Sequence, residues 1–148
     1  MTMHVTAASP GDLPSIRALL DEAGLPHSDL TDSTQVRFWV ARDAGLLGAV
    51  GLESFDDTGL LRSLVVSPDA RGAGLGTRLV ETLEIAAAAA GIQELVLLTQ
   101  TAERFFSQRG YNRIDRAQAP AAVRTTSEFK SLCPASATCM SKTLSVTP

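Results

Sequence analysis

The stretch Arg71-Gly72-Ala73-Gly74-Leu75-Gly76 decides how this chain is built. It follows the apolar segment 60–66, which is typical of a buried strand, and precedes the segment 77–90, whose pattern predicts a helix. Glycine lets the backbone approach an anion closely and adopt a positive φ. The first backbone N–H groups of a helix lack intrahelical partners and can bind that anion. The stretch therefore predicts a site for a phosphorylated ligand, with Arg71 adding charge at its mouth.

Two well-known phosphate loops do not match this pattern. A nucleotide P-loop needs a Lys followed by Ser or Thr after its last glycine, and Gly76-Thr77 follows no such Lys. A dinucleotide fingerprint needs Gly-x-Gly-x-x-Gly, which Gly72 to Thr77 do not supply. The pattern Arg-x-x-Gly-x-Gly between a strand and a helix fits, and it resembles the coenzyme A loop of the GNAT-type N-acetyltransferases. A glycine-rich turn without a ligand is the alternative.

The composition of the 148-residue chain narrows its class. An apolar fraction of 45% and a charged fraction of 20% suit a globular protein, so we expect a single domain over 1–148. No apolar run reaches the length of a membrane span and the N-terminus lacks a signal-peptide pattern, so we expect a cytoplasmic protein without a membrane partner. A net charge of −3 without a basic block argues against nucleic acid as a partner.

The periodicity of apolar residues predicts an α/β fold with a mixed sheet of six to seven strands and about four helices. Turn signals at 43–45 and 56–59 predict an antiparallel N-terminal meander. The strand that follows the helix 77–90 is apolar on both faces, which is typical of parallel pairing through a crossover. The predicted strands are 3–7, 38–42, 46–55, 60–67, 94–99, 111–114 and 138–144, and the predicted helices are 9–23, 77–90, 102–108 and 121–125, with a short helical turn at 26–30.

The order of these elements resembles the GNAT fold over nearly the whole chain. The segment 102–111, a short helix ending in Gly110-Tyr111, is similar to the second signature of that superfamily. The resemblance implies that the strands 60–66 and 94–99 splay apart and hold the pantetheine arm of acetyl-CoA between them, while the glycine loop holds its pyrophosphate. The residues expected to bind acetyl-CoA are Leu64, Val65, Val66, Arg71, Gly72, Ala73, Gly74, Leu75, Gly76, Thr77 and Thr99.

The resemblance also implies the reaction, which is transfer of acetyl from a thioester to an amine by direct attack, without an acyl-enzyme. Many members of the family protonate the leaving thiolate with a tyrosine in the short helix. Here that position is Phe106, which cannot donate a proton, so the general acid is unassigned and water can serve. Tyr111 occupies the glycine–aromatic position, where core packing is favoured over catalysis.

Arg62-Ser63, in the strand before the loop, indicates the substrate class. A guanidinium there would repel an ammonium side chain and suits a carboxylate or another oxyanion. This strand resembles that of glutamate-acetylating enzymes, and the tail 119–137 resembles acetyltransferases encoded beside arsenic-resistance genes, which implies a glutamate-like substrate bearing an arsenic or phosphorus oxyacid. A structural ion pair of Arg62 with Glu53 or Asp57 is the open alternative. The candidate substrate-binding residues are Arg62, Ser63, Arg124, Thr125, Thr126 and Ser127.

Glu53, on the strand next to Arg62, is the candidate general base, acting through water. An α-amine has a pKa near ~8, so a weak base suffices at neutral pH. A solvated or ion-paired carboxylate is the alternative for Glu53. Cys133 and Cys139 are expected to be buried apolar side chains rather than arsenic ligands. No metal-ligand spacing is present, so no metal is expected.

The sequence thus predicts an acetyl-CoA-dependent N-acetyltransferase acting on a small-molecule amine. The acceptor is expected to be an acidic amino acid analogue, with glutamate itself or another small amine as the alternative. A coenzyme A-binding module without catalysis is a third hypothesis, motivated by Phe106. The resemblance also allows a homodimer, although no surface in the sequence specifies one.

Overall fold

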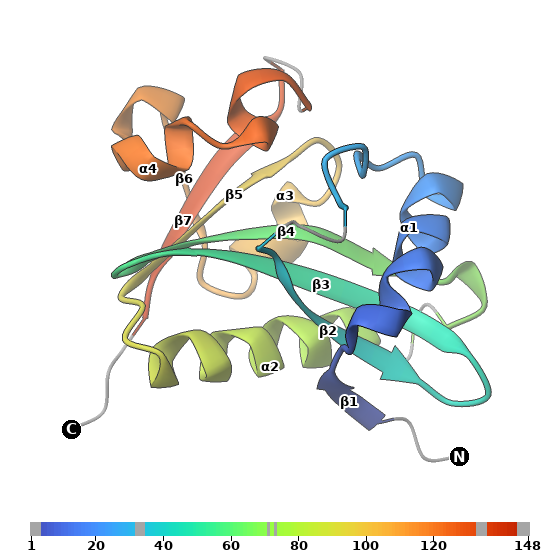
Figure 1. Cartoon of the computed structure of the whole chain (residues 1–148). Helices are drawn as coiled ribbons and strands as arrows, with labels where there is room; N and C mark the ends of the chain where they lie inside the picture. The colour runs from blue at the N-terminus through green and yellow to red at the C-terminus, as the bar shows by residue number, and fades with distance from the viewer. Residues whose placement is uncertain (1–3, 32–34, 71, 73, 133–135, 145–148) are drawn as a thin grey trace. The chain divides into compact units, whose positions relative to one another are not determined.

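A computed structural model describes residues 4–31, 35–70, 72, 74–132 and 136–144 of the chain. Arg71, Ala73 and Cys133 lie outside the described residues, so what was expected of them stays a prediction. Seven strands form one sheet in the order β1-β2-β3-β4-β5-β7-β6 (Figure 1), which confirms the predicted mixed α/β sheet. The chain divides into two compact units, residues 1–53 with 62–86 and residues 54–61 with 87–148, which are described in turn.

The first unit contains the predicted antiparallel meander. β1 pairs antiparallel with β2, and β2 pairs antiparallel with β3, with Val40 opposite Ala49. A two-residue turn at Asp56–Asp57 then leads from β3 to β4, its neighbour in the sheet. The elements that contribute to this unit are β1 (His4–Ala7), α1 (Leu13–Glu22), β2 (Arg37–Arg42), β3 (Leu46–Phe55), β4 (Thr58–Val66) and α2 (Leu75–Ala89), with short 3-10 turns at Pro10–Asp12 and Pro68–Ala70.

Helices α1 and α2 contact opposite faces of β3. Ala49 belongs to the buried cluster that contains Ile16 and Leu20 of α1. A Cβ built on the preceding residue, Gly48, would lie 3.0 Å from Leu79 Cδ1 of α2 and 2.8 Å from the carbonyl oxygen of Val65. Since successive residues of a strand face opposite sides of the sheet, α1 covers one face and α2 the other. The glycine at position 48 lets α2 approach the sheet closely.

Local contacts mark both ends of α1. The N–H of Ser9 donates to Asp12 Oδ2 at 2.9 Å, and Arg42 Nη2 donates to the same carboxylate at 2.8 Å, which ties the start of the helix to β2. Beyond the helix, Gly24 has φ +71. The helical turn expected at 26–30 is a single hydrogen-bonded turn, in which the N–H of Leu30 donates to the carbonyl of His27 at 3.0 Å.

The second unit contains the parallel pairing and the C-terminal strands. β4 and β5 are parallel, with Leu60 opposite Val96, and β5 and β7 are antiparallel along the full length of β5. A buried cluster joins Leu60, Val96, Val123 and Cys139. The elements of the second unit are β5 (Glu94–Thr99), α3 (Glu103–Ser107), β6 (Asn112–Ile114), α4 (Ala121–Arg124) and β7 (Thr138–Thr143), with a 3-10 turn at Arg116–Gln118 and a π-helical turn at Glu128–Leu132. Among the described residues, no helix is long and apolar enough to cross a membrane.

Candidate functional site

The predicted phosphate loop leads directly into α2. Gly72 has φ +89 and Gly74 has φ +73, a conformation that L side chains rarely adopt. A Cβ built on either glycine meets no atom within 4 Å, so the space beside both is open. The carbonyl of Gly74 accepts a hydrogen bond from the N–H of Arg78 at 3.2 Å, which places Leu75 and Gly76 in the first turn of the helix. This backbone fits the close approach of an anion such as a pyrophosphate.

β4 departs from a regular strand at Ser63, which has φ +58. Such a conformation costs a non-glycine residue about 1–2 kcal/mol, so neighbouring contacts must hold it. One of them is the hydrogen bond from Arg62 Nε to Ser63 Oγ, at 3.0 Å. β4 pairs in parallel with β5 from Thr58 to Leu60. The segment Leu64–Val66, which was predicted to bind the pantetheine arm, lies beyond both features.

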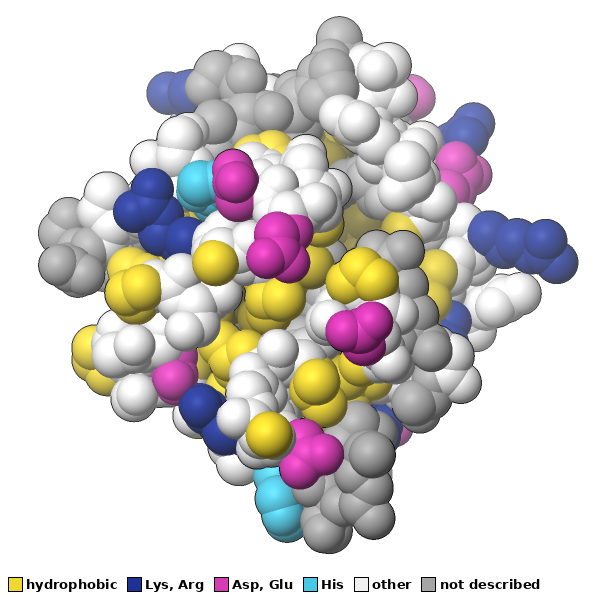
Figure 2. All heavy atoms as spheres, turned by 90° about the vertical axis from the view of Figure 1, so that its right-hand side faces the viewer, with side chains coloured by type: hydrophobic (Ala, Val, Ile, Leu, Met, Phe, Trp, Pro, Cys, Tyr) yellow, Lys and Arg dark blue, Asp and Glu magenta, His cyan; other side chains and the backbone are white. Residues whose placement is uncertain are grey.

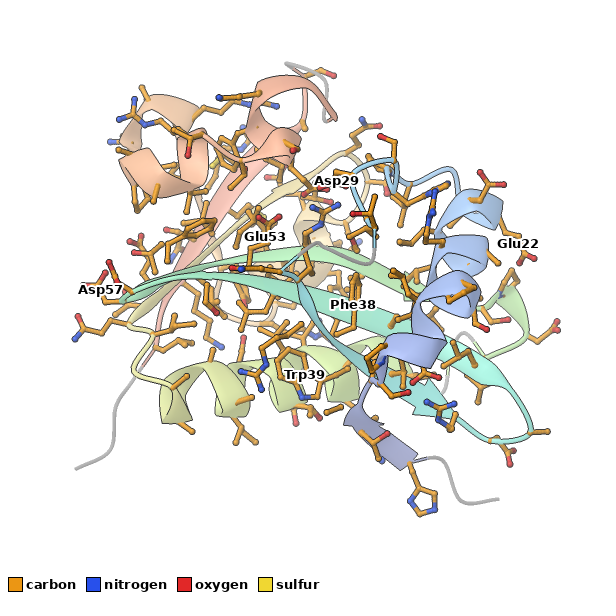
Figure 3. The ribbon with its side chains drawn as sticks, viewed as in Figure 1. Glu22, Asp29, Phe38, Trp39, Glu53 and Asp57 are labelled. Atoms are coloured by element: carbon orange, nitrogen blue, oxygen red, sulfur yellow. The ribbon has the colours of Figure 1, made fainter. Side chains whose placement is uncertain are left out.

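Arg62 gathers two carboxylates around a fully buried side chain, whose exposed fraction is 0%. Its Nη1 donates to Asp29 Oδ2 at 2.6 Å and its Nη2 to Asp29 Oδ1 at 2.8 Å, which makes a two-pronged contact. Nη1 also donates to Glu53 Oε1 at 2.9 Å. Figure 3 shows Asp29, from the segment after α1, and Glu53, from β3, reaching toward the same place. The ion pair with Glu53 that the sequence left open is therefore present, whereas Asp57 lies at the β3–β4 turn.

The Arg62 cluster, defined as Arg62 with Asp29 and Glu53, has a net negative charge because one guanidinium faces two carboxylates. The two carboxylate side chains are each 19% exposed, while the guanidinium is buried. The cluster therefore presents carboxylates to its surroundings. The sequence left two roles open for Arg62, binding of a substrate anion and a structural ion pair, and the structure shows the ion pair. Asp29 was missed because its contact spans 33 positions of sequence and its segment has no periodic pattern.

The remaining predicted substrate residues belong to the second unit, where Arg124 is the last residue of α4 and the other three follow it. Thr125 Oγ1 donates to the carbonyl of Ala122 and Thr126 Oγ1 to the carbonyl of Val123, both at 2.7 Å. With their protons engaged by backbone, these hydroxyls do not donate to an anion in this geometry. Thr126 is buried, whereas Arg124, Thr125 and Ser127 are exposed.

Comparison with known proteins decides the family. Residues 34–113, more than half of the chain, match the model described as an acetyltransferase (GNAT) domain. The chain belongs to the GNAT acetyltransferase family. An amino-acid acetyltransferase from Neisseria meningitidis is 29% identical over 127 residues, which cover 80% of this chain and 29% of that enzyme.

Solved GNAT structures resemble the chain along nearly its whole length. N-acetylglutamate synthase from Neisseria gonorrhoeae, in complex with coenzyme A and N-acetyl-glutamate, has a TM-score of 0.79 and 26% identity, over 98% of this chain and 36% of that one. Rv2747 from Mycobacterium tuberculosis, in complex with coenzyme A and NLQ, shares the fold with a TM-score of 0.79 and 24% identity, over 96% of this chain and 99% of that one. The chain thus spans about a third of the length of the Neisseria enzymes.

The second GNAT signature is packed around α3. Phe106 is buried, and its ring meets that of Tyr111 edge to face, with 5.4 Å between the ring centroids. Tyr111 is only 1% exposed, in accord with the predicted packing role. Thr99 Oγ1 accepts a hydrogen bond from the N–H of Ala102 at 3.0 Å, so its hydroxyl closes the turn between β5 and α3. Among the described groups, α3 offers no tyrosine hydroxyl as a general acid.

Cys139 is a buried thiol, as the sequence predicted. Burial raises its pKa to about 11, with Glu94 adding to the rise and Arg116 opposing it. A protonated thiol is a poor nucleophile and a poor metal ligand. The described residues contain no group of three or more His, Cys, Asp or Glu that could hold a metal ion.

A cavity of about 330 Å³ lies in the first unit, between the start of α1 and β2. Its lining includes Leu13 and Ile16 of α1 and Phe38 and Trp39 of β2. Of the described residues that were predicted to bind acetyl-CoA or substrate, none lines the cavity. Figure 2, which views the side of the molecule that carries α1, shows hydrophobic side chains between acidic ones. The cavity is therefore a feature separate from the glycine loop and the Arg62 cluster.

Proposed function

We propose that this GNAT domain transfers the acetyl group of acetyl-CoA to the α-amine of a small amino acid. The observation that supports the proposal is the pair of positive-φ glycines, Gly72 and Gly74, with open space beside them at the start of α2. Two relatives with the same fold were solved with coenzyme A. The relative in Neisseria meningitidis is an amino-acid acetyltransferase.

The residues that would hold acetyl-CoA are largely backbone donors. Gly72, Gly74, Leu75, Gly76 and Thr77 would bind the pyrophosphate, together with Arg71 and Ala73, while Leu64, Val65 and Val66 would line the pantetheine arm. When bound, acetyl-CoA supplies an activated thioester that an amine can attack directly. Backbone N–H groups at a helix start suit this task because the helix dipole favours the anion there.

Glu53 is the group proposed to take the proton from the acceptor's ammonium, through water. Its carboxylate is held by Arg62 and is 19% exposed, so water can reach it. Loss of that proton leaves a neutral amine, whose nitrogen would form the new C–N bond as the C–S bond breaks. The nitrogen would then release a second proton to water to give the amide. Phe106 has no proton to donate, so the proton for the leaving thiolate comes from water.

The finer proposal concerns the acceptor, for which we propose an acidic amino acid, either glutamate or an analogue with an arsenic or phosphorus oxyacid. It is supported by the resemblance of the strand that contains Arg62-Ser63 to glutamate-acetylating enzymes and by the similarity to N-acetylglutamate synthase. Arg62 could bind a second anion of the acceptor only in place of Asp29. Incubating the protein with acetyl-CoA and a panel of glutamate, its oxyacid analogues and neutral amino acids tests it. Thiol release with glutamate or one of its analogues should exceed the background. If no amino acid in the panel gave release above the background, the enzymatic proposal would be refuted.

A second candidate is a coenzyme A-binding module without catalysis. Phe106, buried against Tyr111 in place of a proton donor, is the observation that favours it. Calorimetric titration with acetyl-CoA, combined with the thiol-release assay on the same amine panel, distinguishes the two candidates. Tight binding without turnover of any amine in the panel would support the module, and turnover would exclude it.

A further inference from the structure

Asp29 occupies the face of Arg62 that a substrate carboxylate would use. A guanidinium binds a carboxylate best through two parallel N–H donors, and Asp29 engages both Nη1 and Nη2, at 2.6 and 2.8 Å. The third nitrogen, Nε, donates to Ser63 Oγ at 3.0 Å. Because the Arg62 side chain has no exposed surface, an incoming anion can make the same contact only in place of Asp29.

The charge of the cluster works in the same direction. Glu53 also binds Arg62, at 2.9 Å, so the guanidinium is already matched by two carboxylates that are each 19% exposed. A second carboxylate on the acceptor would meet like charge at this place, whereas an uncharged side chain would not.

The position of Asp29 is set by its neighbours in the chain. Leu30, the next residue, is completely buried in the cluster that contains α1. Its N–H donates to the carbonyl of His27, and the His27 ring contacts Asp21 of α1 at 3.1 Å. The packing and hydrogen bonds of its own segment therefore hold Asp29 against Arg62.

We infer that Asp29 is a specificity-determining residue. It sets the choice between acidic and uncharged acceptors because it competes with the side-chain carboxylate of an acidic acceptor for Arg62. The inference rests on the proposed acetyltransferase function. With Asp29 in place the domain disfavours acceptors that carry a second carboxylate. Removing its charge shifts the preference toward them.

The test compares glutamate with glutamine, which differ in the charge of the side chain. The kcat/KM of each is measured with acetyl-CoA for the parent, for Asp29→Asn and for the control Asp43→Asn, which removes the same charge from an exposed turn after β2. Asp29→Asn should raise the glutamate-to-glutamine ratio about tenfold, the size of a lost charged hydrogen bond, chiefly through the glutamate KM. In Asp43→Asn the glutamate-to-glutamine ratio should equal that of the parent, and the KM of acetyl-CoA should be the same in all variants. Asp29→Glu, which restores the charge, should restore the parent's preference.

A measurement on the parent protein guards against a variant that fails to fold. If the cluster repels a second carboxylate, added salt screens the repulsion and lowers the glutamate KM relative to that of glutamine. If Arg62 attracts the carboxylate freely, salt has the opposite effect. A rising relative KM, or an unchanged ratio in a folded Asp29→Asn protein, would overturn the inference and leave the acetyltransferase proposal intact.

Absence of turnover would count against the acetyltransferase proposal instead. Calorimetric titration with glutamate then tests Asp29 alone, because the variant should bind glutamate more tightly than the parent does. Equal affinities would overturn the inference.

Discussion

A single methyl group on the glycine loop should separate binding from folding. Gly74→Ala places a Cβ at φ +73, where it meets no protein atom within 4 Å, so the only expected cost to the fold is backbone strain of about 1–2 kcal/mol. If the pyrophosphate binds at this loop as proposed, the same methyl group would limit how closely it can approach the backbone. We therefore expect coenzyme A affinity to fall about tenfold or more, which corresponds to at least about 1.4 kcal/mol of binding free energy.

Gly24 supplies a matched control for this prediction. It has φ +71, and a Cβ built on it also meets no atom within 4 Å, but it lies just after α1. Urea denaturation should show similar losses for Gly24→Ala and Gly74→Ala, while calorimetric titration with coenzyme A should show weaker binding for Gly74→Ala only. Equal affinity of both variants and the parent would refute the assignment of the loop to the cofactor.

Three further predictions concern charged and reactive groups. Arg62→Met should lower the free energy of unfolding by about 3 kcal/mol, because two carboxylates then face each other without their cation; urea denaturation measures this, and a loss below about 1 kcal/mol would contradict it. Cys139 should resist iodoacetamide in the folded protein at neutral pH and become reactive only as the pH nears its pKa of about 11, which mass spectrometry of the Cys139 peptide can follow; rapid labelling at neutral pH would contradict its burial. The pKa of Asp12 is lowered, chiefly by its hydrogen bond to Arg42, so its contribution to stability should be complete above the unfolded pKa and disappear as the pH falls through the folded one; Asp12→Asn should remove that part of the acid dependence, and an unchanged profile would contradict it.

Most of the fold could be predicted because its signals are local. The strand Glu94–Thr99 is apolar on both faces, and the structure pairs it in parallel with β4 and antiparallel with β7. Gly24 and Gly91, which directly follow the predicted helices 9–23 and 77–90, have φ +71 and +91. Each of these features depends on a few neighbouring residues. The kink at Ser63 had no comparable signal, since serine is not a residue that marks a positive φ.

The candidate site was predictable only as far as its contacts are short in sequence. Glu53 was a candidate because the turn at Asp56–Asp57 brings it close to Arg62 on the next strand, within reach of a diagonal pair. The glycine loop could be recognised for the same reason, because its residues are neighbours in the sequence. Asp29 could not be found in this way, because it lies 33 positions before Arg62 in the sequence and only the tertiary fold brings the two together.

Missing Asp29 matters because the net charge of a binding site is the sum of all the charges in it. Read alone, Arg62 favours an anionic substrate, and the resemblance to glutamate-acetylating enzymes points the same way. In the folded chain its donors are shared between Asp29 and Glu53, so the local balance is negative. An acidic acceptor and the observed cluster are compatible only if Asp29 gives up its contact when the substrate binds. If Asp29 keeps the contact, the cluster disfavours a second carboxylate on the acceptor, and the Asp29→Asn variant decides between the two cases.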